Sequence, residues 1–172
     1  MLERKKGIDI VLEIGGIKTT EHAMELFVKK MDSKNFDKIR RIKNAEAILK
    51  IANSIVMCEP DAVFINTGSE ADKKYIKDLS LQKGEEAKLP MKDHTIHFDL
   101  KDEQGRIVDR TFYIANEGEK ISSLANKKLR AEATKEIRNI MVGIMRGKIM
   151  MVGFYMRGPL GAPVSKIGRA HV

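Results

Sequence analysis

The strongest constraint on the fold is a helix–strand–helix pattern in the first half of the chain. The segment 44–57 carries apolar residues at helical spacing and is stopped by Pro60. The run 62–65 is entirely apolar and bounded by turn residues, which predicts a short buried strand. Ser69 can then cap a second helix over 70–83. This interleaving of helices with buried strands predicts an α/β fold of the mixed α+β kind.

The rest of the chain continues the alternation of helices and strands. Turn residues at 102–105 separate two strand patterns and predict a β-hairpin there. We therefore expect a mixed β-sheet flanked by helices. The further helices are expected from residue 20 and over 129–145, and the further strands over 95–100, 107–114 and 148–155.

Composition limits the class of protein. The chain has 172 residues, of which 42% are hydrophobic and 33% charged, which is typical of a globular domain with its own core. No apolar run is long enough to cross a membrane, and the N-terminus lacks the apolar segment of a secretory signal. The single cysteine, Cys58, follows an apolar helix pattern and is expected to be a buried, inert thiol. We expect a cytoplasmic protein with no membrane partner.

Positive charge is concentrated in the last third of the chain. Residues 117–172 carry 11 basic and 4 acidic side chains, whereas residues 1–116 carry 21 and 20. Such an excess suits an anionic partner, but it equally suits a solvated helix face. One alternative function is therefore a small basic nucleic-acid-binding or interaction module. Nucleic acid is the less favoured partner, since no aromatic residues are interleaved with the basic ones and no recognition-helix motif occurs.

Two patterns that suggest a cofactor or a metal fail on spacing. In the segment 143–149 the glycines are four residues apart rather than five, and Ile149 replaces the hydroxyl that would hold magnesium in a phosphate loop. His94 and His97 lie three apart on an expected strand, where their side chains point to opposite faces. We expect structural histidines, and no catalytic, cofactor-binding or metal-binding residue in this chain.

Arg106 and Arg110 form the one candidate binding pair. On a regular strand, a spacing of four places both side chains on the same face. Two guanidinium groups side by side can bind a carboxylate or a phosphate in bidentate fashion. The alternative is a pair of solvent-exposed arginines with Asp109 as a neighbour.

Five short motifs occur in a distinctive order along the chain. They are Cys58-Glu59-Pro60-Asp61, Thr67-Gly68-Ser69-Glu70, Gly105-Arg106-Ile107-Val108-Asp109-Arg110, Met145-Arg146-Gly147-Lys148 and Gly158-Pro159-Leu160-Gly161-Ala162-Pro163. Together they resemble the N-terminal part of the GTP-dependent phosphoenolpyruvate carboxykinases, and most nearly the archaeal-type branch. The resemblance covers roughly residues 44–166, and residues 1–43 are compatible with it.

The resemblance implies a function and a site. The family converts oxaloacetate and GTP into phosphoenolpyruvate, GDP and carbon dioxide in gluconeogenesis, with a divalent metal, Mn²⁺ or Mg²⁺. It implies that Arg110 binds the substrate carboxylate, with Arg106 as support, although Asp109 stands where relatives often have alanine. The family's nucleotide loop, metal ligands, guanine pocket and lid lie downstream of the part resembled. This chain is therefore expected to be an incomplete N-terminal carboxykinase domain, inactive alone.

The last six residues suggest an origin outside the gene. Residues 167–172, Ile-Gly-Arg-Ala-His-Val, are what the bases ATC GGA AGA GCA CAC GTC encode. That string resembles part of a common short-read sequencing adapter. We therefore expect residues 1–166 to be a partial domain of a longer enzyme and residues 167–172 to be derived from the adapter.

Overall fold

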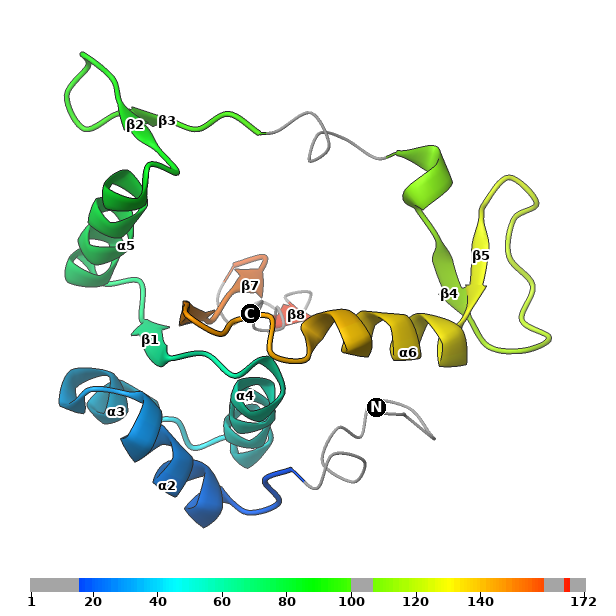
Figure 1. Ribbon diagram of the computed structural model, residues 1–172, viewed down its shortest axis with the longest axis horizontal. Coiled ribbons are helices and arrows are strands. Elements are labelled where there is room, and N and C mark those ends of the chain that lie inside the picture. Colours follow the sequence, from blue (N-terminus) through cyan, green and yellow to red (C-terminus); the bar gives the residue numbers. More distant parts are fainter. Residues whose placement is uncertain (1–15, 100–106, 160–165, 168–172) are drawn as a thin grey trace. The chain divides into compact units, whose positions relative to one another are not determined.

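A computed structural model describes residues 16–99, 107–159 and 166–167 of the chain (Figure 1). These residues belong to two compact units. The first combines the chain up to Thr67 with the chain from Leu129 onward, and the second is Gly68–Lys128.

Three helices of the first unit begin with a polar residue that caps them. They are α2 (Thr20–Lys30), α3 (Ser33–Ile39) and α4 (Ala45–Cys58). The side chains of Thr19, Asp32 and Asn44 each accept a hydrogen bond from a backbone N–H of the first turn, which satisfies a group that the helix itself leaves unpaired. The predictions for α2 and α4 are confirmed. The seven-residue helix α3 was not predicted, because so short a segment shows too little periodicity.

The core of the first unit forms where these helices meet a two-stranded parallel sheet. Strand β1 (Ala62–Asn66) pairs with β6 (Ile149–Gly153). Helix α3 contacts β1, while α2 contacts both α3 and α4, and Figure 1 shows the three helices grouped beside β1. The core residues that are at most 2% exposed include Phe27, Ile39, Ile51, Ile55, Val63, Ile65, Met150 and Val152.

Helix α6 (Arg130–Met141) ends four residues earlier than its apolar pattern predicted. Gly143 follows with a φ of 66°, a left-handed conformation that glycine adopts without strain. The backbone N–H groups of Gly143 and Met145 then donate to the carbonyls of Met57 and Cys58 at the end of α4, both at 2.9 Å. The chain therefore leaves the helix to bind α4, and this turn leads directly into β6.

The second unit begins with a helix whose bounds agree with the prediction. Helix α5 (Glu70–Lys83) starts after Ser69, whose hydroxyl accepts from the N–H of Asp72, and Gly84 ends it with a φ of 73°. Both end signals are local in sequence, which is why they could be predicted.

The predicted hairpin of 95–100 with 107–114 is wrong in its pairing. Strand β3 (Thr95–Ile96) pairs antiparallel with β2 (Ala87–Lys88). Residues 108–110 form the 3-10 helix η2 (Val108–Arg110) instead of a strand. Strand β4 (Tyr113–Ala115) follows and pairs with β5 (Lys127–Leu129). The predicted turn at 102–105 and residue Leu100 lie outside the described residues.

The mixed α/β fold class is confirmed. A last antiparallel pair joins β7 (Met156–Arg157) to β8 (Lys166–Ile167). Over the residues that the structure describes, the strands form four two-stranded ladders rather than one sheet. None of the helices in the described ranges combines the length and the hydrophobicity of a membrane-spanning segment.

Candidate functional site

Arg110 lies at the end of the 3-10 helix η2, immediately before β4. The carbonyl of Ile107 accepts two hydrogen bonds, one from the backbone N–H of Arg110 at 3.0 Å and one from the Thr111 hydroxyl at 2.8 Å. These bonds hold the turn that carries Arg110. The Arg110 side chain is exposed and forms no ion pair with the residues that the structure describes. Its guanidinium is therefore accessible to an anion from solvent.

The structure does not support the prediction that Arg106 and Arg110 lie on the same face of a strand. That prediction needed a regular strand through both residues, whereas Arg110 belongs to a 3-10 helix with about three residues per turn. Arg106 lies outside the described residues. Asp109, the acidic neighbour, is exposed on the same short helix. Arg110 is thus the described member of the predicted site.

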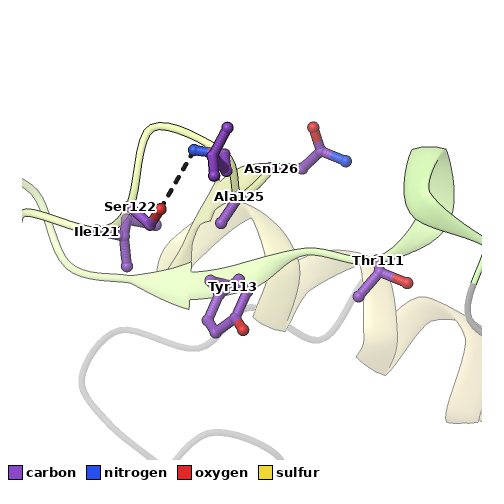
Figure 2. Close-up of a pocket in the computed structure, with 7 residues that line it drawn as sticks. Thr111, Tyr113, Ile121, Ser122, Ala125 and Asn126 are labelled. Atoms are coloured by element: carbon purple, nitrogen blue, oxygen red, sulfur yellow. Dashed lines mark hydrogen bonds between the residues drawn. The ribbon is translucent and has the colours of Figure 1, made fainter.

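A pocket of about 410 Å³ begins one residue after Arg110. Figure 2 shows Thr111 and the ring of Tyr113 on the strand segment, with residues of the 121–126 loop across from them. The Tyr113 N–H donates to the carbonyl of Asn126 at 2.8 Å, which ties the strand to this loop. The residues that line the pocket are Thr111, Tyr113, Ile121, Ser122, Leu124, Ala125 and Asn126.

The loop that closes this pocket is held by its own polar groups. The hydroxyl of Ser122 accepts from the N–H of Leu124 at 3.3 Å, the bond drawn in Figure 2. Lys127 donates to the carbonyl of Glu119 at 2.7 Å, and the Glu119 carboxylate accepts from the N–H of Asn116 at 2.8 Å. Sequence reasoning missed this pocket, because the contact between strand and loop joins residues more than ten positions apart.

The segment 143–149 is a structural clasp rather than a phosphate-binding loop. Besides the two amides that bind α4, the N–H of Gly147 donates to the Asp61 carboxylate at 2.9 Å. A phosphate loop needs such amides free to face its ligand, and here they bind the segment that joins α4 to β1. Arg146 donates to Glu59 at 2.7 Å, and this hydrogen bond lowers the pKa of the Glu59 carboxyl and raises that of Arg146.

The described residues do not fit a divalent-metal site. Among them, no three His, Cys, Asp or Glu side chains come together as ligands could. The ring of His94 contacts the carbonyl of Lys92, and that of His97 contacts the carbonyl of Glu85. Both histidines are exposed, and His97 Nε2 also lies 3.2 Å from the Asp99 carboxylate, so their structural role stays a prediction.

Cys58 is buried, as predicted. It is 2% exposed at the end of α4, and burial raises the pKa of its thiol. The neutral thiol is the less nucleophilic form, which leaves Cys58 a packing role.

The fold and this site define a mixed α/β domain in which the exposed Arg110 lies beside a small pocket. The chain belongs to the phosphoenolpyruvate carboxykinase N-terminal domain family, which matches residues 50–170. That match includes Arg110, the pocket and the clasp. The family predicted from the sequence motifs is therefore confirmed.

Curated relatives agree with the family. A phosphoenolpyruvate carboxykinase [GTP] of Thermococcus kodakarensis is 38% identical over 138 residues, which cover 80% of this chain and 22% of the relative. The corresponding protein of Saccharolobus solfataricus is 38% identical over 135 residues, covering 75% and 22%. That of Pyrococcus furiosus is 36% identical over 137 residues, covering 80% and 22%. The chain thus spans about a fifth of the length of the relatives it matches.

Proposed function

We propose that this chain is the N-terminal part of a GTP-dependent phosphoenolpyruvate carboxykinase. The parent enzyme converts oxaloacetate and GTP into phosphoenolpyruvate, GDP and carbon dioxide, in the service of gluconeogenesis. Residues 1–166 supply part of the substrate site, and the remaining sites belong to the part of the enzyme outside this chain. The observation that carries the proposal is the family match over residues 50–170, together with relatives that bear this name.

In this proposal Arg110 binds the carboxylate of oxaloacetate and phosphoenolpyruvate. Its exposure and its position on a hydrogen-bonded turn support the role, because a guanidinium can present two parallel N–H donors to a carboxylate. Arg106 is the supporting cation. Asp109 is adjacent to Arg110, and its charge weakens the attraction for an anion.

GTP and a divalent metal, Mn²⁺ or Mg²⁺, bind elsewhere in the parent enzyme. When bound, the metal stabilises the developing enolate oxygen and the phosphates. Two observations on the described residues support this placement: no three His, Cys, Asp or Glu side chains come together there, and the amides of Gly143, Met145 and Gly147 already donate to acceptors of the chain itself. We propose that this chain alone has no carboxykinase activity and that the parent works in the cytoplasm.

The test is a chimera in which this chain replaces the matching segment of the Thermococcus kodakarensis relative. In an active chimera, Arg110→Ala should lower kcat/KM for oxaloacetate roughly 30- to 4,000-fold. This factor corresponds to a loss of about 2–5 kcal/mol of transition-state stabilisation. Arg110→Lys, which keeps the charge but loses the planar fork, should lie in between. Lys120→Ala removes an exposed cation of the same unit and is the matched control. Equal kcat/KM for Arg110→Ala and Lys120→Ala would refute the substrate role.

A further inference from the structure

The outer edge of β1 is closed by helix α3. The N–H of Ile65 donates to the side-chain oxygen of Asn35 at 2.8 Å, and Lys38 donates to the carbonyl of Ile65 at 2.9 Å. Asn35 is only 6% exposed, so this contact replaces a strand-to-strand bond in a buried position. The sheet therefore cannot grow beyond β1, and any further strand must join at β6.

The register shows which backbone groups of β6 face away from β1. Residues of a strand turn their N–H and C=O groups alternately to one side and the other. The carbonyl of Lys148 faces β1, since it accepts from the N–H of Asp61 at 3.0 Å. By alternation, Met150 and Val152 also face β1. Ile149, Met151 and Gly153 then direct their backbone groups to the opposite edge.

This opposite edge has the character of an internal strand rather than of a sheet margin. The segment Ile149–Gly153 contains no charged residue and no proline, the features by which natural edge strands avoid unwanted pairing. The side chains of Met150 and Val152 are fully buried, and parallel strands occur mostly inside larger sheets. Over the residues that the structure describes, β1 is the one strand that pairs with β6.

We infer that the outward edge of β6 accepts a further strand from the part of the carboxykinase polypeptide that lies outside these 172 residues. The relatives have about four-fifths of their length outside the matched region, which supplies such a strand. A strand from the same polypeptide pairs without the cost of bringing two molecules together. The inference rests on the proposed function for the occupant, and on the register for the edge.

Residue-resolved amide exchange tests the inference, in this chain and in the Thermococcus kodakarensis chimera. In this chain we expect the amides of Met150 and Val152 to be protected and that of the half-buried Met151 to exchange at least about 100-fold faster. Gly153 is buried and is left out of the comparison. In the chimera, Met151 should become about as protected as its neighbours. Fast exchange of Met151 in the chimera, with Met150 and Val152 protected, would overturn the inference. A Met151 amide that is already protected in this chain would also overturn it. Protection that rises with concentration would point to a second copy of the chain at this edge.

Proline variants give a second readout, the melting temperature of the chimera. Met151→Pro removes an outward N–H and fixes φ at about −65°, which an unpaired edge tolerates better than a paired strand. It should therefore lower the melting temperature well below that of Met151→Ala in the chimera, and much less in this chain. Val152→Pro breaks the ladder to β1 and should destabilise both proteins. A chimera that tolerates Met151→Pro would overturn the inference. Amide exchange can be measured in a chimera that has no enzyme activity. An inactive chimera in which the Met151 amide is protected would therefore refute the proposed function and leave the strand inference standing.

Discussion

Asn35→Ala should destabilise the chain by about 1–3 kcal/mol, because it leaves the buried N–H of Ile65 without an acceptor. The loss of the second bond, from the Asn35 amide to Asp32 at 3.0 Å, adds about 0.5–1 kcal/mol. The better helix propensity of alanine returns about 0.5 kcal/mol. The net expectation remains about 1–3 kcal/mol, dominated by the orphaned N–H.

Urea unfolding followed by far-UV circular dichroism measures this free energy. Lys34→Ala, at an exposed position of the same helix, is the matched control and should change stability by less than about 0.5 kcal/mol. Asn35→Asp keeps an acceptor for Ile65 but places a carboxylate against Asp32, so its stability should recover in acid, where the two groups share a proton. If Asn35→Ala unfolds with the free energy of Lys34→Ala, then α3 does not close the edge of β1.

Three further predictions concern α4 and its end. Ile55→Ala should lower the free energy of unfolding by about 2–5 kcal/mol in the same assay, because Ile55 is 1% exposed in the core. Val56→Ala, at a position that is 37% exposed, should lower it much less, and equal losses would contradict the assigned core. Cys58 should react with a thiol reagent at least about 100-fold more slowly in the folded chain than in urea, and equal rates would show that it is not buried. The lowered pKa of Glu59 gives stability that is present above the unfolded pKa and lost as the pH falls through the folded one. Glu59→Gln should therefore lower stability at neutral pH but not in strong acid, and an unchanged pH profile would mean that Arg146 does not stabilise the folded state.

The sequence predicted those elements whose signals are local. Helix α5 lies between a capping serine and a left-handed glycine, and β1 is an apolar run between turns, so both follow from a few neighbouring residues. The hairpin failed because the partner of β4 is β5, which lies beyond a polar loop and shows no distinctive pattern. Helix α6 was predicted too long, since its apolar residues continue through the clasp that binds α4.

The sequence motif leads to Arg110 as a candidate, and its role stays a prediction. The local geometry could not be predicted, because the 3-10 conformation of Arg110 depends on bonds to Ile107 that no periodicity reveals. The pocket beside it and the role of Asn35 arise from contacts between segments distant in sequence, since Asn35 binds Ile65, which is 30 positions away. Such contacts follow from the packed structure rather than from any local pattern.

If this chain is the front part of a longer GTP-dependent carboxykinase, its gene continues beyond codon 166, and amplifying that gene from genomic DNA shows whether it does. We expect an open reading frame that continues toward the length of the relatives, without the adapter bases, into a phosphate loop and metal-binding residues. A natural stop codon directly after Val172 would refute the proposed function, and a binding role for the basic last third would then become the leading hypothesis.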